Sequence, residues 1–290
     1  QGQLLICTHN SNFLSGVLSS DKKVDIFRLN RHDNITEYNL LPPNATDNLS
    51  KSPILSSQRV IEGIFHKGVV VCEADADRAV YQSVASVEYM SNQEILFIHS
   101  HNKQTHKDVA RLLVEAKIPV ALIVDIDIFN GDADLKNILE ILGDNLENVD
   151  LLEKRKVIAE SVNKVSENEI LEYVKNEIKL FLEQLEKGEH TLNGAKSAYK
   201  RIEKEFTSWK DVKDKGIIGF SSDIQPTVIA LINALKAKGI FVVPVGELEG
   251  WMDLGTKKKN KWIILALNKI HSRGCSPELK DFIKEVLAFF

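Results

Sequence analysis

Four short apolar runs, separated by segments with helical periodicity, constrain the fold of this chain more than any other feature. Three of them follow in close order: "GVVVCEA" (68–74), "EILFIHS" (94–100) and "PVALIVDID" (119–127). Between them, "DRAVYQSVASVEY" and "KDVARLLVEAKI" place apolar residues at helical spacing. Continuous apolar strands that alternate with helices predict a parallel sheet covered on both faces. We expect "KGIFVVPVGELEG" (238–250) to add a fourth strand.

Acidic residues stand at the ends of three of these strands. Glu73 ends the first, Asp125 and Asp127 end the third, and Glu247 and Glu249 end the fourth. The carboxyl ends of parallel strands meet at one edge of a sheet, and clustered carboxylates repel one another unless a cation lies between them. Because hard oxygen ligands suit Mg²⁺ or Mn²⁺, the pattern predicts a metal site at this edge. Acids two positions apart, as in "DID" and "ELE", point the same way if the strand continues that far.

Other polar residues near these strand ends have simpler interpretations. Asp75 and Asp77 begin the helix after the first strand, and either could only cap it. The three histidines of "HSHNKQTH", His99, His101 and His106, lack the spacing and the Cys context of a zinc site. The three cysteines are too few and too scattered for a disulfide framework, which favours a reducing, cytoplasmic setting.

About a hundred residues separate the third and fourth strands, whereas a crossover usually takes about a dozen. They include three helix-like segments, "DLLEKRKVIAESVNKV", "ENEILEYVKNEIKLFLEQLEKG" and "TLNGAKSAYKRIEKEF". We interpret residues 135–238, approximately, as a helical insertion of mixed charge. Two interpretations of this insertion remain: a solvated helical subdomain, or a segment that clamps the substrate. Since none of its acids stands at a recognisable motif position, we expect the insertion to be separable from catalysis.

The first 57 residues form a separate expected unit. "LLICTHN" has the composition of a short buried strand, "NFLSGVL" that of a helix, and "KVDIFRLNR" with "ITEYNLL" that of a hairpin closed across "HDN". Residues 41–57, rich in Pro, Asn and Ser, are expected to be a loop that marks the boundary. Because the sequence opens on a strand-like run without an initiator Met, we expect it to be the C-terminal portion of a longer protein.

Charge and hydropathy limit the partners of the chain. The net charge is −4 and the pI about 6.1, so any nucleic-acid contact has to come from a local basic patch such as "KKKNK". No apolar run reaches the roughly 18 residues of a membrane span, and no signal peptide is visible. We therefore expect a cytoplasmic protein without a membrane partner.

The acidic strand ends carry a family resemblance. "VVVCEADAD" resembles the first motif of the TOPRIM domain, a hydrophobic strand followed by Glu-Gly-x-x-Asp, with Glu73 and Asp77 at the acidic positions and Ala74 in place of the usual Gly. "ALIVDID" resembles the second motif, Asp-x-Asp. "VVPVGELEGW" followed by "KKKNKW" resembles the late acidic and lysine motifs of the nuclease branch. That branch contains the OLD-family (overcoming lysogenization defect) endonucleases and related antiphage defence proteins, in which an ABC-type ATPase is fused to a C-terminal TOPRIM nuclease.

The resemblance implies a fold, a reaction and a set of site residues. The fold is an α/β, TOPRIM-like parallel sheet flanked by helices over residues 58–290, preceded at 1–57 by the end of an ABC-type ATPase domain. The reaction is Mg²⁺- or Mn²⁺-dependent endonucleolytic hydrolysis of DNA at a two-metal site. The implied metal ligands are Glu73, Asp77, Asp125, Asp127 and Glu249, with Glu247 as the alternative to Glu249. The implied catalytic groups are Glu73, Asp125 and Asp127 with one lysine, Lys259 or Lys261, and Lys103 is a candidate phosphate contact.

The ATPase part of the resemblance is incomplete. "LLICTHNSNFL" resembles the end of that domain, with His9 matching its switch histidine, but no phosphate loop, signature loop or Walker B acid precedes it. We expect no ATP hydrolysis by this chain alone, and His9 to sense the γ-phosphate of ATP only together with the missing part. The longer protein would use ATP, form a homo-oligomer through its ATPase part, and act with a partner defence protein where one exists.

Two other functions compete with a nuclease. One is a non-catalytic module that binds nucleic acid or mediates oligomerisation or regulation. The other is a different TOPRIM chemistry, strand passage or primer synthesis, for which no Tyr-bearing or zinc-binding domain is visible. The retained acids Glu73, Asp125 and Asp127 favour a catalytic domain.

Overall fold

The structure, a computed structural model, describes most of the chain. The described residues are 4–20, 23–51, 58–89, 94–100, 103–143, 146–164, 167–188, 191–205 and 209–290.

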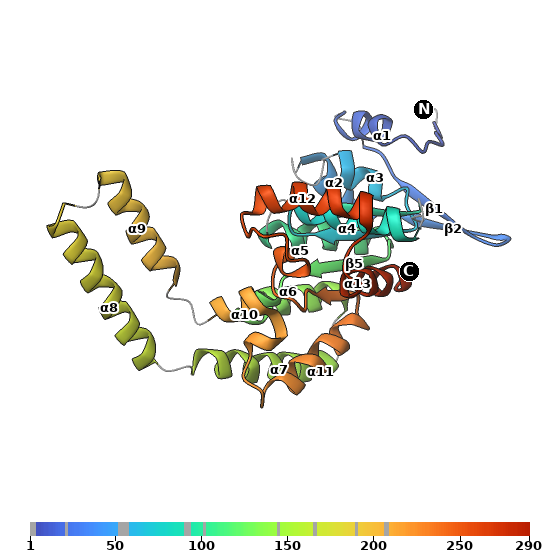
Figure 1. Cartoon of the computed structure of the whole chain (residues 1–290). Coiled ribbons are helices and arrows are strands. Elements are labelled where there is room, and N and C mark those ends of the chain that lie inside the picture. Colours follow the sequence, from blue (N-terminus) through green and yellow to red (C-terminus); the bar gives the residue numbers. More distant parts are fainter. Residues whose placement is uncertain are drawn as a thin grey trace.

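The centre of the fold is a four-stranded parallel sheet in the order β4-β3-β5-β6 (Figure 1). Its strands are β3 (Gly68–Cys72), β4 (Ile95–His99), β5 (Val120–Val124) and β6 (Ile240–Val242). This confirms the predicted parallel sheet and its four strands. Every residue of β3 and β5 is buried, as expected for inner strands that helices cover on both faces.

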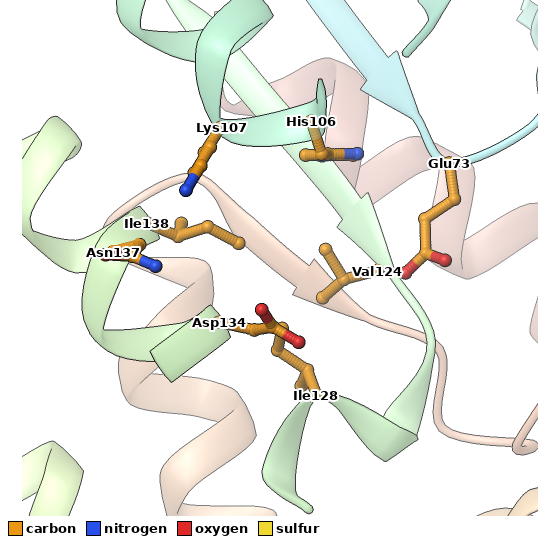
Figure 2. Close-up of a pocket in the computed structure, with 8 residues that line it drawn as sticks. All are labelled: Glu73, His106, Lys107, Val124, Ile128, Asp134, Asn137 and Ile138. Carbon is orange, nitrogen blue, oxygen red and sulfur yellow. The ribbon is translucent and has the colours of Figure 1, made fainter. Parts of the chain in front are cut away.

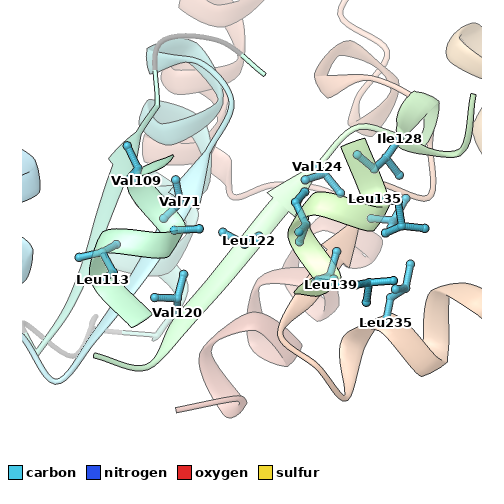
Figure 3. Close-up of a cluster of buried hydrophobic side chains, with 14 of the residues drawn as sticks. Val71, Val109, Leu113, Val120, Leu122, Val124, Ile128, Leu135, Leu139 and Leu235 are labelled. Atoms are coloured by element: carbon cyan, nitrogen blue, oxygen red, sulfur yellow. The ribbon is translucent and has the colours of Figure 1, made fainter. Parts of the chain in front are cut away.

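Alternation along the strands divides the core into two clusters, one on each face of the sheet. Val69 and Val71 point to one face, while Val70 and Cys72 point to the other. The first face packs against α5 (Lys103–Glu115), α6 (Asp132–Leu142), α7 (Leu146–Asn163) and α11 (Gln225–Lys236) (Figure 3). The second face packs against α4 (Asp75–Tyr89), α12 (Lys259–Arg273) and α13 (Pro277–Ala288).

The N-terminal part agrees with the sequence only in places. The helix α1 (Ser11–Leu18) and the hairpin of β1 (Phe27–His32) with β2 (Ile35–Leu40) are confirmed. Residues 41–51 are not the expected loop, because α2 (Pro43–Lys51) forms and buries Ala45 and Leu49 in the first core cluster. A further helix, α3 (Gln58–Gly63), adds to the same cluster. The expected boundary near residue 57 lies outside the described residues and stays a prediction.

The expected strand "LLICT" is wrong. Residues 4–10 have no regular structure, and the side chains of Leu4 and Leu5 are 81% and 83% exposed. A strand needs a neighbour to pair with. Among the described residues, β1 and β2 pair only with each other and the central sheet ends at β4 and β6.

The insertion divides into a packed part and a projecting part. The helices α8 (Glu167–Glu186) and α9 (Leu192–Glu205) contact each other and extend away from the body (Figure 1). In contrast, α6, α7 and α11 bury Leu135, Ile158 and Leu235 against the sheet, and α10 (Lys210–Lys215) with the 3-10 turn η2 (Gly216–Gly219) packs near the strand ends. Both ends of the expected insertion therefore belong to the packed core, and its separability from catalysis stays a prediction.

The strands β5 and β6 end earlier than predicted, before the acids that follow them. β5 stops at Val124, and the 3-10 turn η1 (Ile126–Phe129) follows. β6 stops at Val242. Gly246, at φ +100°, then turns the chain toward another 3-10 turn, η3 (Leu248–Trp251). The argument from strand alternation therefore fails for both acidic pairs, and their positions follow from these turns.

No helix in the described part of the chain is both long and apolar enough to cross a membrane.

Candidate functional site

The ends of the two inner strands, β3 and β5, are joined by a hydrogen bond between Asp125 and Glu73. The backbone N–H of Asp125 donates a hydrogen bond to Glu73 Oε1 over 3.3 Å. β3 and β5 are parallel neighbours, so the residues after Cys72 and Val124 emerge side by side at one edge of the sheet. The predicted meeting of Glu73 and Asp125 is thus confirmed.

Asp77 brings α4 into the same edge. Its Oδ2 accepts a hydrogen bond from the backbone N–H of Ala74 (3.0 Å), so Asp77 stabilises the start of the helix from inside its first turn and not as the N-cap residue. Its Oδ1 lies 3.7 Å from Lys259 Nζ, and the side chain is only 12% exposed. Burial raises the pKa of Asp77 above its usual value, against the opposing charge of Lys259. Asp77 therefore both stabilises the helix start and is a buried acid next to a cation.

The neighbouring Asp75 behaves differently. It is 64% exposed, and its Oδ1 pairs with Arg78 Nε at 2.7 Å and with His99 Nε2 at 3.5 Å. The hydrogen bond from Arg78 lowers the pKa of this carboxyl. The structural interpretation of Asp75 is the one that the geometry supports.

Asp127 is held by a lysine that the sequence did not reveal. Lys213 Nζ, from α10 of the insertion, lies 2.7 Å from Asp127 Oδ2. Nothing in the local pattern "WKDVKDKG" singles out this lysine, because it reaches the site only through the packing of the insertion. Only a contact prediction between the insertion and "DID" would have found it.

Glu247 and Glu249 complete the acidic edge from the loop after β6. The crowding of protein atoms around Glu247 raises the pKa of its carboxyl, while Lys213 and Lys259 oppose the rise. Glu249 is partly buried, and its Oε2 has no hydrogen-bond partner among the described residues. Glu249 therefore has a buried carboxylate oxygen that lacks a protein hydrogen-bond partner.

Lys259 lies among these acids, whereas Lys261 does not. Burial alone would lower the pKa of Lys259, but the carboxylates of Asp77, Glu249 and Asp125 outweigh it and raise the pKa. Lys259 is the first residue of α12. Lys261 is exposed and lines an open surface hollow with Lys258, Lys259, Asn260 and Ile264.

Glu73 also lines a pocket next to the end of β5. Figure 2 shows it between α5 and α6, where Lys107 and Asp134 face each other across the opening. The remaining lining residues are His106, Val124, Ile128, Asn137 and Ile138. Glu73 thus lines this pocket and also accepts the hydrogen bond from Asp125.

The remaining sequence candidates are three histidines near β4, Lys103 and His9. His106 is buried, with its Nδ1 3.1 Å from Ser100 Oγ, and His99 contacts Asp75, so these two do not form a zinc site. His101 lies outside the described residues, and Lys103 is the first residue of α5. His9 is exposed in the coil before α1.

The donor set suits a divalent cation, although it is not arranged as a finished metal site. Lys259 and Lys213 supply positive charge to the six carboxylates of this edge, and Glu249 Oε2 is buried without a protein hydrogen-bond partner among the described residues. Across the described ranges, no three His, Cys, Asp or Glu side chains converge closely enough to hold an ion. The chemistry of the residues fits Mg²⁺ or Mn²⁺, and lysines balance the acids in this arrangement.

Asp77→Asn is expected to stabilise the protein at neutral pH. The change removes a buried charge while an amide oxygen can still accept the hydrogen bond from Ala74. Because the pKa of Asp77 is raised in the folded state, the wild type loses stability as the pH rises from the unfolded-state pKa through the folded-state pKa. Melting temperatures from pH 4 to 8 should show a gain for the variant that is largest at high pH and shrinks on acidification. A gain that is larger at pH 4 than at pH 8 would contradict the assignment.

The comparisons with known proteins bear on the same strands. Residues 64–127 match the family model described as overcoming lysogenization defect protein-like, TOPRIM domain. The matched range contains Glu73, Asp77, Asp125 and Asp127, while Glu249 and Lys259 lie beyond it. Neither curated proteins nor solved structures give a significant match to the chain.

The match and the architecture agree. TOPRIM domains bind divalent metals such as Mg²⁺ and act on nucleic acids, so the match points to metal-dependent nucleic-acid processing. The parallel sheet with flanking helices is the fold that the sequence predicted and is consistent with a TOPRIM domain. The chain thus has a TOPRIM-like α/β fold in which residues 64–127 are similar to an OLD-like TOPRIM domain.

Proposed function

We propose that this chain is a metal-dependent endonuclease that hydrolyses phosphodiester bonds in DNA. The observation that carries the proposal is the meeting of acids from three strand ends and α4 with Lys259 at one edge of the sheet. A stable soluble fold has no need of such a cluster, because partly buried carboxylates close to one another raise the electrostatic energy of the folded state. A site for cations and phosphate accounts for it.

The protein groups divide into ligands and fixed cations. Glu73, Asp77, Asp125, Asp127 and Glu249 are the groups that would hold Mg²⁺ or Mn²⁺, which when bound would activate water and stabilise the leaving oxygen. Lys259 supplies a fixed positive charge for the transition state, and the surrounding acids keep it protonated by raising its pKa. Because the backbone N–H of Asp125 donates to Glu73 Oε1 at the adjacent strand end, the Glu73 carboxylate is positioned before any substrate binds.

The start of α12 supports a phosphate-binding role. Lys258, Lys259 and Lys261 all lie at the N-terminus of this 15-residue helix, where the helix dipole disfavours cations. Lysines placed against the dipole do not stabilise the helix, but they add to an end that already attracts anions. The hollow that they line adjoins Lys259 and hence the acidic edge, so it is suited to the DNA backbone.

The finer parts of the proposal rest on the sequence resemblance. The motif order from "VVVCEADAD" to "KKKNKW" supports an OLD-type nuclease, and "LLICTHNSNFL" with His9 supports regulation by an ABC-type ATPase in a longer protein. A role in antiphage defence, ATP as a cofactor and a homo-oligomer formed through the ATPase part belong to the same proposal. A non-catalytic nucleic-acid-binding module is the competing function, and the test below separates the two.

Lys259→Ala is expected to lower kcat for cleavage of supercoiled plasmid in Mg²⁺ or Mn²⁺ on the order of 100-fold, because it removes a fixed cation from the transition state. Lys261→Ala should raise KM and leave kcat within a few-fold, since this lysine is expected to contact only the DNA backbone. Lys269→Ala, an exposed change farther along the same helix, serves as the matched control.

The outcome also tests the activity itself. Cleavage by the wild type should stop on addition of EDTA and return with excess Mg²⁺. Plasmid binding without any cleavage in Mg²⁺ or Mn²⁺ would support the non-catalytic module instead. An equal loss of kcat in the Lys259 and Lys261 variants would contradict the separate roles proposed for the two lysines.

A further inference from the structure

Lys213 brings positive charge to the acidic edge from the helical insertion. Its Nζ lies 2.7 Å from Asp127 Oδ2, and the two side chains are 39% and 12% exposed. The charge of Lys213 also opposes the raised pKa of Glu247. A single lysine thus acts on the turn after β5 and on the loop after β6.

The backbone around Lys213 is held close to the loop after β6. A Cβ on Gly246 would collide with the carbonyl oxygen of Lys213, and a Cβ on Gly216 would collide with that of Pro244. Both glycines have positive φ, +100° and +64°, so side chains are excluded by space and by conformation. Ile217 N donates to Pro244 O over 2.9 Å. These contacts fix α10 in register with the acidic loop.

The position of Lys213 places it in competition with a divalent cation. An ammonium group only donates hydrogen bonds, so it cannot itself be a metal ligand. While Nζ occupies Oδ2 of Asp127, a cation that uses this oxygen has to displace it. The four-carbon stem and partial exposure of Lys213 allow the ammonium to move away without a change in the backbone.

We propose that Lys213 is a positioning residue that balances Asp127 in the metal-free site and competes with the divalent cation for this carboxylate. The insertion, through α10, thereby sets the metal affinity of the site. This inference rests on the proposed function in so far as Asp127 is a metal ligand. It adds a residue outside the range matched by the family model and a role for the insertion.

Isothermal titration calorimetry of the full chain with MnCl₂ alone tests the proposal. Lys213→Met keeps the stem and removes the charge, so we expect Mn²⁺ to bind about 3- to 10-fold more tightly, as the loss of one nearby positive charge would give. Lys213→Gln should tighten binding similarly, and Lys213→Arg should restore wild-type affinity. Lys215→Met is the matched control, because Lys215 lies on the same helix and pairs with Asp211 at 2.9 Å.

The sign of the change separates competition from a structural role. A lysine that only braced the site would give weaker Mn²⁺ binding when removed, so unchanged or weaker binding by folded neutral variants overturns the inference. The proposed function fails separately. If Mn²⁺ does not bind the wild type, or binds Asp125→Ala equally well, then both fall. If the wild type binds Mn²⁺, needs Asp125 and matches Lys213→Met, only the role of Lys213 is wrong.

Discussion

Asp125→Ala is expected to abolish plasmid cleavage in Mg²⁺ or Mn²⁺ while the protein stays folded. Asp125 follows directly on β5, and its backbone bonds to Glu73 at the neighbouring strand end, so its carboxylate is placed to bind a cation shared with Glu73. Loss of residues that only support a metal ligand costs about 10- to 100-fold, so loss of a ligand should cost at least about 100-fold. Initial rates of nicking and the Mn²⁺ affinity should fall together.

Asp75→Ala provides a matched control at the same edge of the sheet. Asp75 is an exposed acid that pairs with Arg78 and His99, so its loss should leave the cleavage rate within a few-fold. An exposed ion pair contributes about 0–1 kcal/mol, so stability should change little in this control. Undiminished nicking by a well-folded Asp125→Ala protein would remove the nuclease assignment from this site.

Two deletions in the insertion are expected to have opposite results. Replacing residues 165–208 with a short Gly-Ser linker removes α8 and α9, which project from the body (Figure 1). The flanking chain ends already meet, because Trp209 Nε1 donates to Asn163 Oδ1 over 3.2 Å. We expect this variant to fold, to keep its melting temperature within a few degrees and to bind Mn²⁺ as the wild type does.

Replacing residues 135–238 should prevent folding. This deletion removes Leu135, Leu139, Ile158, Leu231 and Leu235, each of which is at most 1% exposed. Burial of each such side chain stabilises the fold by about 1.5–3 kcal/mol. The loss of five of them is therefore comparable with the whole free energy of unfolding of a domain, roughly 5–15 kcal/mol. Circular dichroism and thermal melts of both variants check the pair. A soluble, cooperatively melting product of the larger deletion would show that α6, α7 and α11 are dispensable.

Local sequence patterns predict the helices of the insertion but not their packing partners. The three helix-like segments of the sequence correctly predicted α7, α8 and α9, because helix-forming residues follow one another along each of them. Which of these helices packs on the sheet depends on partners far away in the chain. α7 packs with α11, some seventy residues later, whereas α8 and α9 contact mainly each other. The sequence therefore predicted these helices but not which of them pack against the sheet.

The sequence by itself determined the parallel sheet and the chemistry at its edge. Continuous apolar runs define β3, β4 and β5, and the acids that follow them, Glu73 and Asp125, were predicted to meet and do. These features can be read locally, because a strand buried on both faces consists of consecutive apolar residues. The parallel order of the strands then brings their carboxyl ends to one edge of the sheet.

Only the tertiary structure decided the details of the site. Lys213 reaches Asp127 because glycines at 216 and 246 allow two distant segments to touch, and no local pattern encodes such a contact. The same close approach accompanies the turn after β6, so the positions of Glu247 and Glu249 do not follow strand alternation. Exposed Leu4 and Leu5 show the same limit, because an apolar run becomes a strand only where another strand offers hydrogen bonds.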